Sequence, residues 1–179
     1  MPQERWRRPF PSSGRRYSQR VLIALDTPHT PDVLELIGRH LAENYATSPP
    51  ESVHALGADA LTHPSISFWS AREEVSGQLL GIGALKRHSP EMAELKSMRT
   101  TEAARRRGVA SALLRAIIKD CRRAGVRELN LETGAEDYFA PARALYERTG
   151  FEACPPFAAY TTDPNSVYLS LRIAPDGAR

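Results

Sequence analysis

The spacing of apolar residues along the chain changes between two periods, one typical of strands and one typical of helices. Short runs with a period of two, bounded by Gly, Pro, Asn or Asp, predict strands. Stripes of apolar residues three and four positions apart predict amphipathic helices. The predicted strands cover residues 21–25, 66–71, 79–85, 92–100, 126–132, 151–154 and 167–171. The predicted helices cover residues 31–47, 51–64, 109–124 and 141–148.

The order of these elements predicts one mixed domain. A helix joins the strand at 92–100 to the strand at 126–132, and such a helical crossover implies a parallel pair. The hairpin over 66–85 predicts antiparallel neighbours. A chain of 179 residues is long enough for one sizeable core and short for two. We therefore expect a single-domain α+β fold, with a mixed and mostly antiparallel sheet, a central parallel pair and helices on both faces.

The strand at 92–100 has an unusual pattern, because neither face is cleanly apolar. A strict period of two gives two sets of residues. One face would carry Leu95, Ser97 and Arg99, and the other would carry Glu94, Lys96, Met98 and Thr100.

Charge is distributed unevenly along the chain. The net charge is +3, but the first twenty residues hold six arginines and one acid, so the remainder carries −2. Residues 1–19 also contain three prolines and few apolar side chains, which predicts a flexible basic head. We expect the folded domain at 20–173 and a short tail at 174–179. A nucleic-acid-binding role for the head is the less favoured alternative.

Composition excludes several classes of protein. The chain is 41% hydrophobic and 25% charged, and no apolar run approaches the roughly 20 residues of a membrane span. It has two cysteines, no Cys-x-x-Cys pair and five histidines without metal-ligand spacing. We expect a cytoplasmic protein with no metal, no membrane partner and no nucleic-acid partner.

The segment before the helix at 109–124 carries the clearest chemical signal. It reads Arg105-Arg106-Arg107-Gly108-Val109-Ala110-Ser111 and follows a predicted strand. The first N–H groups of a helix have no partner inside the helix and lie at the positive end of its dipole. Gly108 allows a bound group to approach the backbone closely. The segment is therefore suited to a pyrophosphate, although it lacks the glycine and lysine pattern of a P-loop.

This segment and a second one together resemble the GNAT acetyltransferase family. Residues 98–114 resemble the family motif Arg/Gln-x-x-Gly-x-Gly/Ala that follows its fourth strand. Leu145-Tyr146-Glu147-Arg148-Thr149-Gly150-Phe151 is similar to the family signature LYxxxGF. The resemblance covers about residues 20–173, and residues 94–100, 131–134 and 163–167 resemble one bacterial branch of uncharacterised members.

The resemblance implies a reaction and a set of cofactor contacts. Acetyl-CoA would donate its acetyl group to the amine of a small molecule or amino-acid-like acceptor, by direct attack in a ternary complex. The pyrophosphate would lie on N–H groups from Arg106 to Ser111, and the pantetheine arm would pair with the strand near Met98, where the parallel strands splay apart. An N–H near Met98 would polarise the thioester carbonyl. The implied cofactor-binding residues are Met98, Arg99, Thr100, Arg105, Arg106, Arg107, Gly108, Val109, Ala110, Ser111, Phe139 and Tyr146.

The same resemblance suggests the groups that move protons. Tyr146 matches the family tyrosine that donates a proton to the departing thiolate, and a phenol with a pKa of about 10 is protonated at neutral pH. Glu94 is the first candidate for the base, and Glu132 is the second. Both carboxylates are also candidates for attracting a cationic acceptor. Phe139 stands where many members have asparagine, so we expect apolar packing against the cofactor arm there.

Several alternatives stay open at this point. Arg143 is either a ligand for a phosphate or for an acceptor carboxylate, or a solvated residue of its helix, and the solvated position is favoured. The acceptor is either a small amine or a protein lysine or N-terminus, and a non-catalytic acyl-CoA-binding module is a third reading. The segments expected to shape an acceptor site are residues 26–65 and 152–165. They have the least regular spacing of apolar and polar residues in the chain. The resemblance also makes a homodimer an expectation to test.

Overall fold

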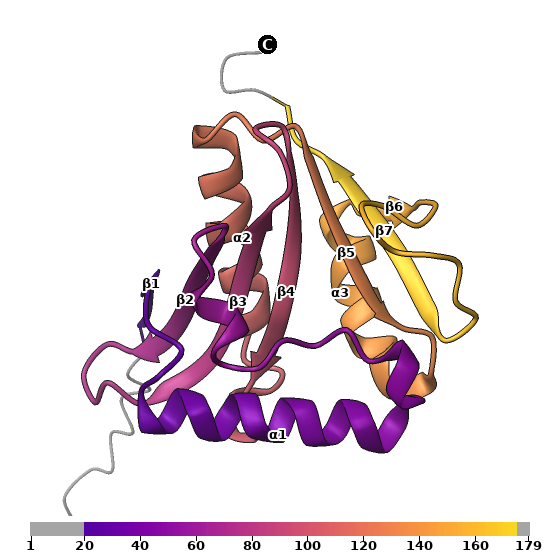
Figure 1. Ribbon diagram of the computed structural model, residues 1–179. Helices are drawn as coiled ribbons and strands as arrows, with labels where there is room; N and C mark the ends of the chain where they lie inside the picture. The colour runs from indigo at the N-terminus through magenta and orange to yellow at the C-terminus, as the bar shows by residue number, and fades with distance from the viewer. Residues whose placement is uncertain (1–19, 175–179) are drawn as a thin grey trace, which may run out of the picture.

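A mixed sheet with the strand order β1-β2-β3-β4-β5-β7-β6 forms the centre of the molecule in the computed structural model, which describes residues 20–174 (Figure 1). β4 and β5 are parallel, and every other neighbouring pair is antiparallel. The predicted fold class is therefore confirmed. The strands are β1 (Val21–Leu25), β2 (Ile66–Glu73), β3 (Leu79–Arg87), β4 (Met92–Thr100), β5 (Glu128–Gly134), β6 (Glu152–Ala153) and β7 (Ser166–Arg172).

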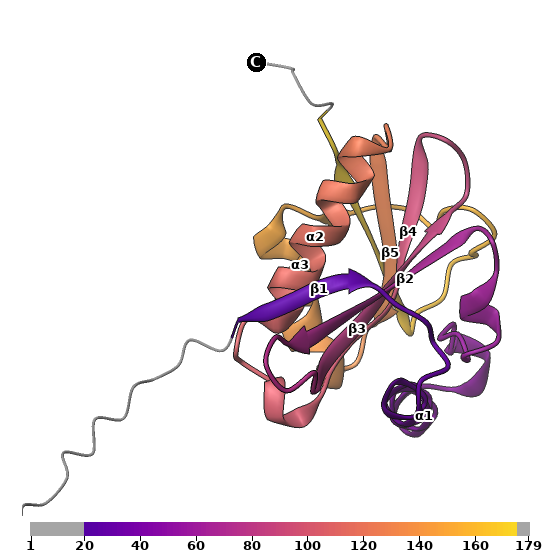
Figure 2. The same cartoon turned by 90° about the vertical axis from the view of Figure 1, so that its left-hand side faces the viewer.

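Helices cover both faces of this sheet. α2 (Val109–Arg123) and α3 (Ala140–Thr149) lie on one face, and α1 (Pro31–Thr47) lies on the other (Figure 2). The apolar stripe predicted for α2 is confirmed, because its residues are buried against β3, β4 and β5. The buried residues of this stripe are Val109, Leu113, Leu114, Ile117, Ile118 and Cys121. The predicted head, residues 1–19, lies outside the described residues.

The helix predicted over 51–64 is wrong. The structure has two single 3-10 turns there, η1 (Pro50–Ser52) and η2 (Ala60–Thr62). Gly57 interrupts the segment, and Pro64 disfavours helical backbone at the residue before it. Each remaining piece is too short for its hydrogen bonds to offset the free-energy cost of helix nucleation. Leu61 is nevertheless 1% exposed, so its apolar spacing reflects burial under the sheet and not a helix.

A bulge in β4 changes which side chains face α1. The pairing with β3 shifts between Ile82, which opposes Arg99, and Ala84, which opposes Lys96. Ser97 accordingly has a φ of +52°. The predicted faces are therefore wrong beyond Lys96, since Met98 packs with the core under α2 and Arg99 lies on the α1 side. Gly83 makes room for this, because a Cβ there would lie 2.7 Å from the Met98 sulfur.

The two parallel strands separate after a short paired stretch. Their register runs from Met92 opposite Glu128 to Leu95 opposite Leu131. Beyond that point β4 continues to Thr100, while β5 pairs with β7 alone. α1 crosses the end of the sheet where the strands diverge (Figure 1). The fold thus leaves a gap between the carboxyl ends of its central strands.

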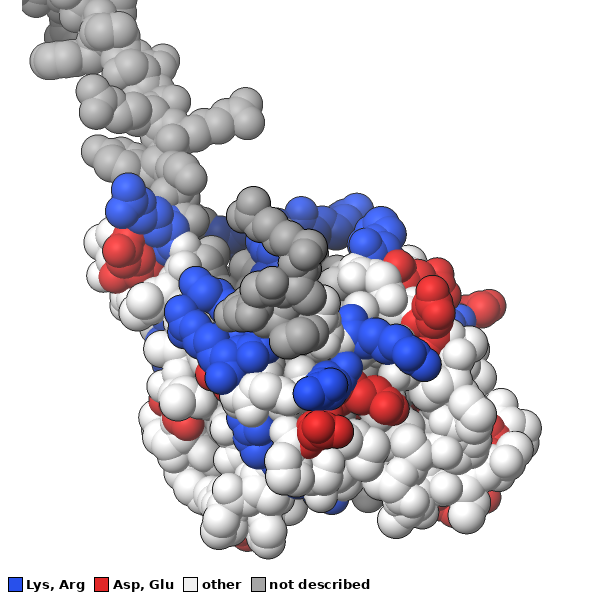
Figure 3. Space-filling view, turned by 90° about the horizontal axis from the view of Figure 1, so that it is seen from above, with Lys and Arg blue, Asp and Glu red and all other residues white. Residues whose placement is uncertain are grey.

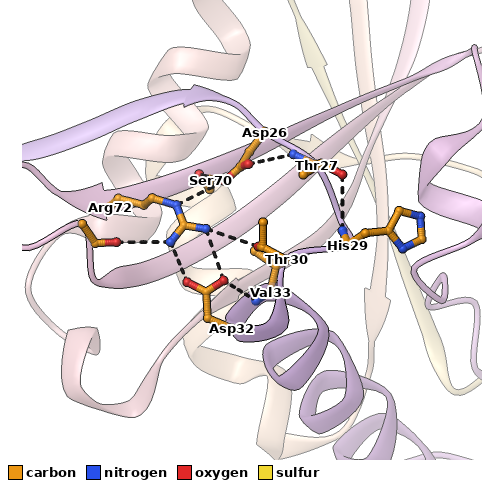
Figure 4. Close-up of polar contacts among 9 residues, drawn as sticks. Asp26, Thr27, His29, Thr30, Asp32, Val33, Ser70 and Arg72 are labelled. Atoms are coloured by element: carbon orange, nitrogen blue, oxygen red, sulfur yellow. Dashed lines mark hydrogen bonds and ion pairs between the residues drawn. The ribbon is translucent and has the colours of Figure 1, made fainter.

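An ion network fixes the start of α1 to the sheet. Arg72 on β2 contacts Asp26 at 3.2 Å and Asp32 at 2.6 Å, and Ser70 donates a hydrogen bond to Asp26 at 2.6 Å (Figure 4). The hydrogen bond from Arg72 lowers the pKa of Asp32 to about 2. Burial tends to raise the pKa of Asp26, but its hydrogen bonds lower it overall. The position of α1 therefore depends on two ionised carboxylates.

Basic and acidic side chains are interspersed on the face of the molecule seen from above (Figure 3). Arginine outnumbers lysine by 21 to 3 in the sequence. On this face, acidic side chains lie between the basic ones. Within residues 20–174, no helix is long and apolar enough to cross a membrane.

Replacing Arg72 by Met should destabilise the protein by about 1 kcal/mol at pH 7, because the partly buried Asp26 and the exposed Asp32 lose their cation. Depressed carboxyl pKa values stabilise the fold above the unfolded pKa and lose that contribution as pH falls toward the folded pKa. Wild-type stability should thus fall between about pH 4 and pH 2, and less steeply in Arg72→Met. Urea unfolding over this pH range measures both effects.

The matched control is Arg39→Ala, which removes an exposed ion pair with Glu35 on α1. It should change stability by less than about 0.5 kcal/mol. Equal losses in the two variants would show that the Arg72 network does not anchor α1.

Candidate active site

A cavity of about 930 Å³ occupies the region where β4 and β5 diverge. Its wall includes Lys96, His54 and Glu43 from the α1 side of the sheet, and Ser111 and Tyr146 from the side of α2 and α3. The cavity therefore connects the two faces of the sheet through the gap between its parallel strands.

The start of α2 presents unused backbone donors to this cavity. Gly108 has a φ of +80° and precedes the helix without a capping side chain. Among the described residues, no acceptor is found for the backbone N–H groups of Arg106, Gly108, Val109, Ala110 and Ser111. The helix dipole adds positive potential at the same place. These donors fit the diphosphate of a bound coenzyme A.

The three arginines before α2 differ in their surroundings. Arg105 and Arg106 line the cavity, and Arg106 has a φ of +58°. Arg107 is not among the cavity-lining residues, and its guanidinium donates to the carbonyl oxygen of Ala103 at 3.1 Å. Two of the three predicted arginine side chains therefore lie at the cavity.

The edge of β4 beyond Leu95 supplies the second cofactor surface. Met98 and Thr100 line the cavity, and β4 has no pairing with β5 at these positions. Arg99 also lines the cavity, but its guanidinium forms an ion pair with Glu43 of α1 and a hydrogen bond with Tyr138 at 3.0 Å. The strand edge can therefore accept an extended arm, while the Arg99 side chain faces α1.

The segment between β5 and α3 has an apolar wall. Phe139 lines the cavity and lies against Gly134, where a Cβ would be 2.2 Å from the Phe139 ring. Arg143 donates to the carbonyl oxygens of Gly134 and Glu136 at 2.7 and 2.9 Å. The Arg143 side chain, for which the sequence left several roles open, therefore holds this turn together.

Tyr146 lies on α3 at the deep side of the cavity. It is 7% exposed and its ring packs against Phe151. Its hydroxyl has no hydrogen-bond partner among the described residues. Burial raises the pKa of Tyr146. The phenol is therefore protonated at neutral pH and is available to donate a proton into the cavity.

Glu94 has surroundings that differ from those expected of a base. It is 2% exposed and is not among the cavity-lining residues. Its carboxylate accepts hydrogen bonds from Tyr160 at 2.6 Å and His88 at 2.8 Å, and Lys96 lies at 3.1 Å. Burial tends to raise the pKa of Glu94, but Lys96 and the hydrogen bonds lower it overall. These contacts hold Lys96 at the cavity wall.

Glu132 has the opposite electrostatic setting. It lines the cavity at the end of β5 and accepts a hydrogen bond from Ser166 at 2.8 Å. Burial raises the pKa of Glu132, and the nearby Lys96 and His54 offset only part of that effect. Of the two predicted candidates, Glu132 is therefore the carboxylate at the cavity with the raised pKa.

Several polar residues at the cavity carried no functional signal in the sequence. Lys96 was placed on a strand without a role for its charge, and His54 lies in the segment wrongly predicted as a helix. Tyr160, which contacts Lys96 and does not itself line the cavity, falls in a segment without periodicity. The helical spacing of α1 predicts an outer polar face, but it does not predict that Glu43 reaches Arg99 and Tyr138. Within residues 20–174, no group of three or more His, Cys, Asp or Glu side chains could hold a metal ion.

Comparisons with known proteins agree with this geometry. The acetyltransferase (GNAT) family model matches residues 31–151. The chain is 44% identical to the uncharacterized N-acetyltransferase YsnE of Bacillus subtilis, over 84% of this chain and 99% of that protein. It is also 44% identical to the uncharacterized N-acetyltransferase YedL of Escherichia coli, over 84% of this chain and 94% of that protein.

A solved structure shares the fold. It is a GNAT family acetyltransferase from Elizabethkingia anophelis with acetyl-CoA bound, 16% identical, which covers 85% of this chain and 97% of its own, with a TM-score of 0.60. With the family model matching most of the chain and bacterial relatives named N-acetyltransferases, this chain belongs to the GNAT family of acetyltransferases.

Proposed function

We propose that this acetyltransferase moves an acetyl group from acetyl-CoA to a small-molecule amine by direct attack, with both substrates bound at once. The observation that carries the proposal is a single cavity that joins unused amide donors on one face of the sheet to Glu132 on the other. Such a cavity lets two substrates enter from opposite faces and meet between β4 and β5.

The α2 side is suited to the cofactor. The amides of Gly108 to Ser111 would hold its diphosphate, the edge of β4 near Met98 would pair with the pantetheine arm, and Phe139 would pack against that arm. Acetyl-CoA supplies an acyl group activated as a thioester. Oriented binding of this kind replaces a bimolecular encounter with a positioned one.

The α1 side is suited to the amine. An amine arrives as an ammonium ion and must lose a proton before its nitrogen can attack a carbonyl. Glu132, whose pKa is raised by burial, would take this proton. As the C–N bond forms and the C–S bond breaks, Tyr146 would give its proton to the leaving sulfur. The nitrogen would then release its second proton, which would restore the Tyr146 phenol, and Glu132 would pass the first proton to solvent.

The location of the two cysteines in the chain supports direct attack. Cys121 lies fully buried in the core under α2, and burial raises its pKa to about 12. Cys154 is not among the cavity-lining residues. A covalent acyl-cysteine step would need a thiolate at the cavity.

Gly108→Ala should weaken coenzyme A binding by about tenfold or more, because a methyl group would enter the space of the diphosphate. Gly125→Ala is a matched control, since both glycines have a left-handed φ and open space around a Cβ. The two variants should lose similar stability, and only the first should lose affinity in a calorimetric titration. Equal affinities would contradict the placement of the diphosphate.

Glu132→Gln should lower kcat by about a hundredfold with little change in coenzyme A affinity, as expected for loss of a general base. Wild-type kcat/KM should rise with pH through the raised pKa of Glu132. In the variant, this rise in the pH–rate profile should be absent. Glu128→Gln, on the exposed start of the same strand, is the control. If Glu94→Gln lost the pH limb and Glu132→Gln retained it, the base would be Glu94.

Tyr146→Phe should lower kcat by about tenfold to a hundredfold, because the leaving thiolate loses its proton donor. The ring keeps its packing on Phe151, so stability should change little. Stopped-flow thiol release measures the step directly. Unchanged release would assign the acid role to another group or to water.

A further inference from the structure

We propose that the acceptor is an amine that carries no free carboxylate beside its amino group, a simple or aryl-substituted alkylamine and not a free amino acid. The inference rests on the proposed function and names the acceptor class for the same cavity. It follows from how the charged side chains on the α1 side of the cavity are already paired.

The first cation on that side, Lys96, is fully engaged. It is 9% exposed, lies 3.1 Å from a Glu94 oxygen and donates to the Tyr160 hydroxyl at 2.7 Å. Tyr160 donates to the same Glu94 oxygen at 2.6 Å. This closed triangle leaves the Lys96 charge neutralised, and breaking it would leave a buried carboxylate without its cation.

The second cation, Arg99, is engaged as well. It is 15% exposed and pairs with Glu43 of α1, which also accepts a hydrogen bond from Tyr138. A substrate carboxylate would have to displace Glu43 to bind Arg99. Arg148 lies on α3, and Arg106 lies before α2 next to the amides proposed for the diphosphate. Arg105, in the same segment, lies close enough to Glu43 to help lower the pKa of that carboxyl, so its charge also acts on Glu43.

Glu132 is the remaining carboxylate at this side of the cavity. Glu132 accepts a hydrogen bond from Ser166 and forms no ion pair among the described residues. His40 adds no charge at neutral pH, because burial lowers its pKa to about 4. His54 offsets only part of the effect of burial on Glu132. One ammonium group would therefore pair with Glu132, whereas the carboxylate of a zwitterion would compete with Glu94 and Glu43 for cations that already act on them.

The test compares pairs of acceptors that differ by one carboxylate, such as phenethylamine with phenylalanine, tyramine with tyrosine, and putrescine with ornithine. The full chain is assayed with saturating acetyl-CoA, and thiol release gives kcat/KM for each member. In each pair, kcat/KM should be higher for the amine that lacks the carboxylate, by about tenfold or more. Equal or better turnover of the amino acids would overturn the proposal.

A variant tests the physical cause. Glu43→Gln frees the charge of Arg99, so it should shrink the preference within each pair by about tenfold by improving the carboxylate-bearing member. Glu35→Gln lies on the same helix, is exposed and does not line the cavity, and it should leave the preference unchanged. An unchanged preference in both variants would contradict the role of the Arg99–Glu43 pair.

Calorimetry with the same pairs and the coenzyme A-loaded wild-type protein separates this proposal from the proposed function. Preferential binding of the decarboxylated members without thiol release would support the acceptor class and contradict acetyl transfer to it. Thiol release with preferred binding of the amino acids would contradict the acceptor class alone.

Discussion

The divergence of β4 and β5 is the constraint on which the site depends. The strands share a register only as far as Leu95 and Leu131, and the bulge at Ser97 then redirects β4. Continued pairing would fill the cavity with backbone hydrogen bonds and would hide the edge of β4. The sheet thus loses a few ladder bonds and gains a passage between its two faces, lined by residues of both.

This passage separates two electrostatic environments. On the α2 side, unused amides and the helix dipole favour an anion. On the α1 side, two neutralised cations and the half-buried Glu132 favour a single positive charge. The gap between the strands is the place where these environments meet, which suits a reaction between a negatively charged cofactor and a cationic amine.

The parts that could be predicted from the sequence are those that depend on local pattern. The order of strands and helices follows from periodicity, and the donor-rich start of α2 follows from Gly108 and the residues after it. The helix expected over 51–64 failed because apolar spacing there reflects burial of residues such as Leu61 in extended backbone. The residues that hold the cofactor and those that move protons are still proposals.

The acceptor side could not be predicted, because its contacts join distant segments. Glu43 meets Arg99 and Tyr138 across 56 and 95 residues of sequence. Strict alternation cannot place Arg99 on the α1 face, since the bulge at Ser97 shifts the period by one residue. Tyr160 reaches Glu94 from a loop without periodicity, so its part in holding Lys96 appears only in the folded chain.

A crystal structure of the full chain with coenzyme A and an amine bound would test the central claim most directly. The account predicts the diphosphate on the amides of Gly108 to Ser111, the sulfur between β4 and β5 near Tyr146, and the amine nitrogen on the α1 side beside Glu132. Coenzyme A bound away from the start of α2, or both ligands entering from one face of the sheet, would contradict it.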